Sequence, residues 1–100
     1  MFILNLTYKV SIDVIKQYMD GHIEFLDNQF QNGNFILSGR KIPRVGGIII
    51  SVQTNKSDLM ETIKKDPLCY HKLADYEIIE FCASKTSEIL KFLNEKSDNQ

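Results

Sequence analysis

Hydrophobic residues follow two different spacings along this chain, and the change of spacing indicates where its strands and helices lie. Between positions 2 and 8 every second residue is apolar, which predicts a strand. Between positions 11 and 33 apolar residues recur every three or four positions, so we expect one long amphipathic helix. Ser11 suits its N-cap, and Gly33 suits its C-terminal end because glycine accepts a left-handed backbone.

The same reasoning predicts the remaining elements. Short apolar runs indicate three further strands, at 34–39, 48–52 and 76–82. Asn55 can cap a second helix, which Pro67 should stop. Residues 68–73 are short and irregular, with room for one helical turn, and Ser84 should begin a last helix.

The resulting order is β-α-β-β-α-β with a helix at the end, which predicts an α+β fold of the split βαβ, ferredoxin-like arrangement. In that arrangement helices cover one face of a four-stranded antiparallel sheet. A chain of 100 residues suits a single domain. We expect this domain to span residues 1–96 and a polar tail to occupy residues 97–100.

Three of the predicted strands are apolar at consecutive positions, so both of their faces are apolar. The runs are 35–37, 48–50 and 78–79. Helices on one side would leave a large apolar face open to water, which soluble monomers rarely tolerate. A second copy of the chain is the available cover, so the sequence predicts a homodimer packed sheet on sheet, a dimeric α+β barrel.

The overall composition narrows the classes of function. Hydrophobic residues make up 43% of the chain and charged residues 25%, which is ordinary for a soluble globular protein. The net charge of −1 gives no basis for nucleic-acid binding, which favours a strongly basic face. No apolar run has the length of a membrane span, and the first residues lack the basic start of a signal peptide. We therefore expect no membrane partner and a cytoplasmic location.

The cysteines give no sign of a metal site. Cys69 and Cys82 are the only two, and they lack both the C-x-x-C spacing and the second ligand cluster of a zinc site. Two buried thiols are the expectation in the cytoplasm, while the sequence leaves a single disulfide open. We expect neither a metal nor an organic cofactor.

His22 is the residue with the clearest chemical potential. On the predicted long helix it lies about 50° from the centre of the apolar stripe, on the same flank as Tyr18 and Phe25. An imidazole that a carboxylate orients can act as a general acid or base near neutral pH. A histidine that only packs at the helix edge would give the same pattern. Gly21 is unfavourable inside a helix, which is consistent with a packing or access requirement beside His22.

Asp66 is the candidate carboxylate. Its position before Pro67 favours extended backbone geometry. An Asp-Pro pair that simply ends a helix is the alternative interpretation. At the negative end of a helix an aspartate is slightly unfavourable unless a cation compensates, and either the neighbouring lysines or a histidine could do so.

A basic cluster follows the second predicted strand. Arg40, Lys41 and Arg44 lie in the loop at 40–45, between Ser38-Gly39 and Gly46-Gly47. Guanidinium groups select carboxylate or phosphate, and glycines allow a ligand to approach the backbone closely. A solvated hairpin loop is the alternative, and the pattern is neither a P-loop nor a dinucleotide fingerprint.

Taken in order, several short motifs resemble those of the YciI-like (YCII-related domain) family. They are His22-Ile-Glu-Phe-Leu, Leu37-Ser-Gly, Pro43-Arg-Val-Gly-Gly, Asp66-Pro67 and Tyr76-Glu-Ile-Ile-Glu-Phe, within about residues 1–85. The resemblance implies a ferredoxin-like dimeric barrel, a His22–Asp66 catalytic dyad, and a pocket that Ser38 and Gly39 line. The wider barrel superfamily includes isomerases and monooxygenases.

These observations predict a small cofactor-independent enzyme of the lyase or isomerase type that acts on a small anionic or aromatic metabolite. His22 would be the general acid or base, and Asp66 would hold its ring. Arg40 or Arg44 would bind an anionic group, while Tyr18 and Phe25 would hold a ring. Two other classes also fit: a non-catalytic dimer that binds a small ligand in the same pocket, and a structural adaptor.

Overall fold

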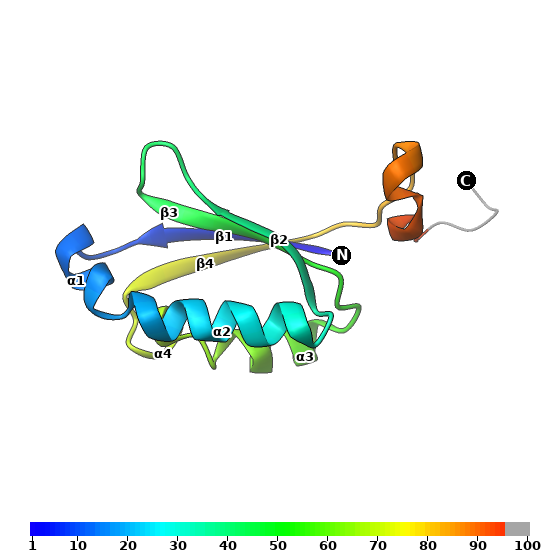
Figure 1. Ribbon diagram of the computed structural model, residues 1–100. Helices are drawn as coiled ribbons and strands as arrows, with labels where there is room; N and C mark the ends of the chain where they lie inside the picture. The colour runs from blue at the N-terminus through cyan, green and yellow to red at the C-terminus, as the bar shows by residue number, and fades with distance from the viewer. Residues whose placement is uncertain (96–100) are drawn as a thin grey trace.

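Four strands form one antiparallel sheet, and helices α2, α3 and α4 lie on one of its faces (Figure 1). The strands are β1 (Phe2–Tyr8), β2 (Phe35–Arg40), β3 (Gly46–Ser51) and β4 (Ala74–Glu80). Their order in the sheet is β2-β3-β1-β4. This computed structural model describes residues 1–95, so the tail predicted at 97–100 lies outside the described residues. The predicted α+β class is confirmed.

β1 lies inside the sheet, between β3 and β4. Phe2 and Leu4 are fully buried and Leu6 is 2% exposed, because all three point toward the helices. They form the main core with residues from β2, β3, α2 and α3, namely Phe35, Ile49, Phe25, Leu59 and Ile63. The strand predicted at 76–82 begins two residues earlier, at Ala74.

The long helix predicted from Ser11 to Gly33 is two helices, which is a correction to the sequence interpretation. They are α1 (Ile12–Gln17) and α2 (Met19–Gln31), with a break at Tyr18. Ile15 of α1 packs into a second cluster with Leu68 and Leu73, whereas Phe25 of α2 packs into the main core. The break lets each half face a different cluster. Both predicted ends are confirmed: Ser11 caps α1, and Gly33 has a φ of 79°.

Two shorter helices follow β3. Asn55 caps α3 (Lys56–Ile63), as predicted, by accepting a hydrogen bond from the Asp58 amide. Pro67 does more than stop a helix, because it is the first residue of α4 (Pro67–Tyr70), where its fixed φ and missing N–H are tolerated. Among residues 1–95, no helix combines the length and the apolar character that crossing a membrane would require.

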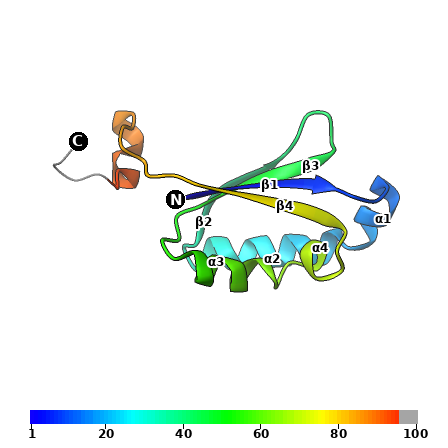
Figure 2. The same cartoon turned by 180° about the vertical axis from the view of Figure 1, so that it is seen from behind.

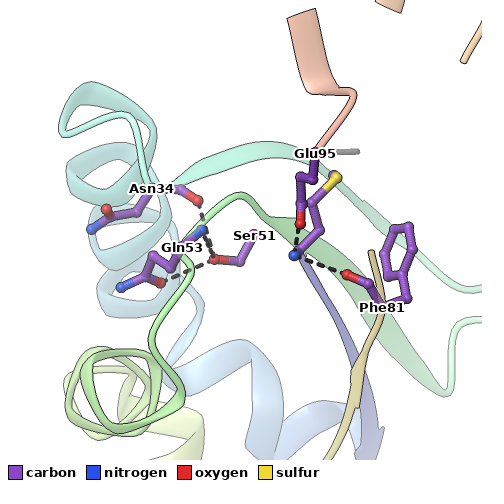
Figure 3. Close-up of polar contacts among 6 residues, drawn as sticks. Asn34, Ser51, Gln53, Phe81 and Glu95 are labelled. Atoms are coloured by element: carbon purple, nitrogen blue, oxygen red, sulfur yellow. Dashed lines mark hydrogen bonds and ion pairs between the residues drawn. The ribbon is translucent and has the colours of Figure 1, made fainter. Parts of the chain in front are cut away.

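The C-terminal part of the chain leaves the sheet. The helix predicted from Ser84 is wrong, because residues 81–87 are irregular and only a 3-10 helix, η1 (Glu88–Leu93), follows them. η1 stands apart from the α/β body (Figures 1 and 2). At this end of the sheet the Met1 nitrogen contacts the Phe81 carbonyl at 3.0 Å and the Glu95 carboxylate at 2.9 Å (Figure 3). On the neighbouring strand, the Ser51 hydroxyl donates to the Asn34 carbonyl at 3.2 Å.

The face of the sheet opposite the helices is open within the described chain. It is apolar at the end nearest Met1 and polar further along, where Asn5 hydrogen-bonds to Glu77. On this face Ile3 pairs with Ile50 on one side and Ile79 on the other. Leu37 pairs with Ile50 and is 61% exposed, and Ile79 is 45% exposed. The predicted apolar character of this second face is therefore present over part of the face.

Gly46 occupies a position in β3 where a side chain has no room. A Cβ atom built there overlaps the Leu6 carbonyl oxygen, which belongs to the backbone of β1 and cannot move without breaking the ladder. We expect Gly46→Ala to lower the free energy of unfolding by about 3 kcal/mol or more, the upper range for overpacking. Urea denaturation measures this. Gly39→Ala is the matched control, because no atom lies within 4 Å of its Cβ, and an equal loss in both variants would contradict the argument.

Candidate functional site

Asp66 is a fully buried carboxylate at the start of α4. Its backbone is extended (φ −76°, ψ 123°), as the following proline requires, and its side chain accepts a hydrogen bond from the Leu68 amide at 3.0 Å. The interpretation of Asp66 as a simple helix-terminating turn is therefore incomplete, because the residue caps the next helix. Its side chain has 0% exposure, so its charge needs partners inside the protein.

Two further donors meet this carboxylate. His22 Nδ1 lies 2.8 Å from Asp66 Oδ1, and the Tyr76 hydroxyl donates a short hydrogen bond to Asp66 Oδ2. The fold thus brings together the two residues that the sequence singled out, although 44 positions separate them. Because Nδ1 faces the Asp66 carboxylate, Nε2 is the ring nitrogen left to face a ligand.

The break at Tyr18 changes where His22 points. A continuous helix would have placed it on the flank of the apolar stripe, but α2 buries Phe25 and Gln29, which are three and seven residues further along. His22 therefore lies on the inward face of α2, and its side chain is 13% exposed. Its ring stacks near Phe25 at a centroid distance of 6.3 Å.

Tyr76 is the member of this cluster that the sequence analysis missed. Burial, together with the neighbouring Asp66 carboxylate, raises the pKa of the Tyr76 hydroxyl far above its ordinary value, so the group stays protonated and donates. The available signal was its position: Tyr76 pairs with Leu6 on the helix side of the sheet, and an inward tyrosine hydroxyl needs a partner.

Tyr76 should make the domain sensitive to alkaline pH. Above the ordinary tyrosine pKa of 10.0 the unfolded chain loses this proton while the folded chain keeps it. The free energy of unfolding therefore falls as pH rises, by up to about 1.4 kcal/mol per pH unit. Tyr76→Phe should cost about 1–2 kcal/mol at pH 7 through the lost hydrogen bond, and this difference should shrink above pH 10.

Urea denaturation between pH 7 and pH 11 measures the difference between wild type and Tyr76→Phe. Tyr70→Phe is the control, because Tyr70 is 74% exposed and its hydrogen bond to the Asp66 carbonyl comes from the backbone amide, which the substitution leaves in place. A constant gap between wild type and Tyr76→Phe across this range would contradict the assignment.

Gly21 has a packing role beside the dyad. A Cβ atom at Gly21 would lie 3.0 Å from Pro67 Cγ, so the glycine lets α2 approach the segment that holds Asp66. Glycine inside a helix is unfavourable relative to alanine, but here it allows the close packing that brings His22 and Asp66 into contact.

We therefore expect Gly21→Ala not to give the usual gain of about 1 kcal/mol in a helix, because the methyl group pushes on Pro67. Gly21→Val should lose about 1–3 kcal/mol by overpacking. Thermal and urea unfolding measure both variants. Glu24→Ala, one turn later on an exposed part of α2, serves as the control, and a full gain for Gly21→Ala would contradict the close approach.

His22 opens onto a cavity of about 260 Å³ between α2 and the sheet. The predicted residues Ser38, Gly39, Arg40 and Arg44 all line it. Met19, Ile23 and Leu26 form its apolar wall, and Gly46 and Gly47 add bare backbone. Apart from His22, the ionisable side chains on the described wall are arginines and Tyr8, and none is a carboxylate, so the cavity favours an anion.

Two predicted ligand-binding residues lie elsewhere, which is a second correction. Phe25 is 5% exposed and belongs to the main core, and Tyr18 packs against His71 with ring centroids 4.8 Å apart. Neither lines the cavity. Because the helix breaks at Tyr18, the apolar residues of α2 that face the cavity are Met19, Ile23 and Leu26.

The cysteines differ from the expected buried pair. Cys82 is exposed and Cys69 is partly buried, and both are free thiols. Burial raises the pKa of the Cys69 thiol, and the Asp66 carboxylate adds to this effect. Cys69 is therefore a poor nucleophile near neutral pH.

Comparison with known proteins adds no family assignment: no family model matches the chain, and neither a curated protein nor a solved structure matches it.

Proposed function

We propose that this chain is a YciI-like protein with the ferredoxin-like fold, and that two copies pack sheet on sheet as a dimeric α+β barrel. The strand order β2-β3-β1-β4 with helices on one face supports the fold. The open apolar face around Ile3, Ile50 and Ile79 supports the dimer, because water contact there is unfavourable.

The chemistry proposed is cofactor-independent acid–base catalysis of the lyase or isomerase type on a small anionic metabolite, with an apolar or aromatic body. His22 Nε2 takes a proton from the substrate, and the ring becomes an imidazolium that the Asp66 carboxylate stabilises. In an isomerisation the imidazolium returns this proton to another carbon. In an elimination the substrate's bonding electrons expel a leaving group, which can receive the proton.

The cavity supplies the remaining parts of this proposal. Arg40 and Arg44 bind the anionic group of the substrate, and guanidinium suits a carboxylate well. The wall of Met19, Ile23 and Leu26 excludes water from one side of the bound molecule. The observation that carries the proposal is the 2.8 Å contact between His22 and Asp66 at the wall of an arginine-lined cavity.

The test has two stages. A thermal-shift screen compares small carboxylates with their neutral amides, using wild type and Arg44→Gln. We expect carboxylates to stabilise the wild type more than their amides do, and Arg44→Gln to remove that preference. Stabilising ligands are then incubated with wild type and His22→Ala in D₂O, and proton NMR follows exchange of their C–H groups.

Exchange or conversion by wild type, lost in His22→Ala, supports catalysis. A ligand that binds in the cavity but stays unchanged and unexchanged contradicts it and favours the non-catalytic, ligand-binding dimer. The exchange readout detects proton abstraction even when the screened ligand is only an analogue of the substrate.

A further inference from the structure

Two exposed apolar patches lie at opposite ends of the molecule. The first is on residues 81–95, here called the arm, where η1 buries none of its residues. Ile89 is 82% exposed and Phe92 is 73% exposed, and they share a face because a 3-10 helix has three residues per turn. The second is the tip of the β2–β3 hairpin, where Ile42 is 95% exposed and Val45 is 48% exposed.

The arm cannot reach the hairpin tip of its own chain. β1 begins beside the arm, where Met1 contacts Phe81, and ends beside the hairpin, where the Tyr8 amide donates to the Val45 carbonyl. Seven strand residues therefore separate the two patches, a distance of about 20 Å or more. Both views place η1 and the hairpin tip on the side of the sheet that faces away from the helices (Figures 1 and 2).

Charge indicates how a second copy would be oriented. The hairpin carries three basic residues, Arg40, Lys41 and Arg44, and no carboxylate, whereas the arm carries two glutamates and two lysines and is neutral overall. If two copies met sheet on sheet with parallel strands, hairpin would face hairpin and the basic groups would repel. With antiparallel strands, each arm faces the partner's hairpin, which separates the two basic hairpins and places apolar beside apolar.

We propose that the arm of one copy packs against the hairpin tip of a second copy. This inference rests on the sheet-on-sheet dimer proposed above. Ile89 and Phe92 pack on Ile42 and Val45, and the two-fold axis repeats the contact at both ends. Because Arg40 and Arg44 belong to both the hairpin and the cavity wall, the partner's arm holds the groups that face the ligand.

Disulfide trapping tests the contact directly. In a background of Cys69→Ala and Cys82→Ser, a chain with Ile42→Cys is mixed with a chain with Phe92→Cys under mild oxidation. Both positions are exposed, so the substitutions should leave the fold intact. We expect a cross-linked heterodimer. Tyr70→Cys replaces Ile42→Cys in the control, because Tyr70 is also exposed, at 74%, but belongs to α4 in the helix layer.

A second measurement removes the apolar contacts without a crosslink. Ile89→Ser with Phe92→Ser should weaken the dimer by about tenfold or more in sedimentation equilibrium, since buried apolar and aromatic anchors dominate such contacts. Lys91→Ser, in the same helix and 74% exposed, should leave the dissociation constant unchanged.

The outcomes separate this inference from the proposed function. Crosslinks between two copies at position 92, with none between positions 92 and 42, overturn the arm contact but leave the dimer in place. An unchanged dissociation constant in the serine variants has the same meaning. A wild type that stays monomeric at micromolar concentration overturns both the contact and the dimer. The D₂O exchange experiment reports on the dyad independently of either result.

Discussion

Asp66→Ala is expected to lower the free energy of unfolding by about 3–5 kcal/mol, the largest stability loss that we predict for a single side chain. The substitution removes the cap of α4 and leaves the Tyr76 hydroxyl and the Leu68 amide, both buried, without their acceptor. The total free energy of unfolding of a natural domain is about 5–15 kcal/mol, so the variant should be close to unfolding at physiological temperature. Urea denaturation at pH 7 measures the loss.

Asp66→Asn separates the structural part of this effect from the electrostatic part. The amide oxygen can still accept from Leu68, so we expect a loss of only about 1–2 kcal/mol. The amide carries no charge and no longer stabilises an imidazolium at His22, so exchange of a bound carbon acid should still fall sharply. Asp58→Asn is the control, since Asp58 is an exposed helix residue. Equal losses for Asp66→Ala and Asp66→Asn would contradict the role assigned to the three hydrogen bonds.

The second large effect concerns His22. We expect His22→Ala to reduce proton exchange or turnover by about 10²–10⁴-fold, the usual contribution of a positioned general acid or base. The fold should persist, because Asp66 keeps its bonds to Leu68 and Tyr76, and the loss of one hydrogen bond costs about 1–2 kcal/mol. NMR exchange in D₂O and urea denaturation give the two quantities on the same samples.

His71→Ala is the matched histidine control, because His71 is exposed and packs against Tyr18 outside the cavity. It should leave exchange unchanged. If His22→Ala exchanges the ligand as fast as wild type does, His22 is not the base, whatever its distance from Asp66.

Local patterns predicted most of the secondary structure. The alternation from Phe2 to Tyr8 marks a strand with the observed bounds, and Ser11, Gly33 and Asn55 mark the helix ends where they occur. These signals act over a few residues, so the sequence itself carries them. Local signals could not predict the break at Tyr18, because it depends on the packing of Ile15 and Phe25 into two different hydrophobic clusters.

The candidate site was predictable in part for the same reason. Residue chemistry singled out His22 and Asp66, and glycines and arginines indicated a ligand-facing hairpin. The helix phase could not be known without the break, so Phe25 was assigned to the ligand although it lies in the core. Tyr76 was missed because its partner, Asp66, meets it only through the packing of α4 against β4.

The three hydrogen bonds of Asp66 also bear on how this chain would change over evolutionary time. A descendant that lost its reaction would still need Asp66 to fold, so selection for stability alone would keep the aspartate. His22 carries far less of the fold and would drift once chemistry no longer mattered. Among related sequences, we therefore expect the aspartate in all that keep the fold, and the histidine only in those that also keep the reaction.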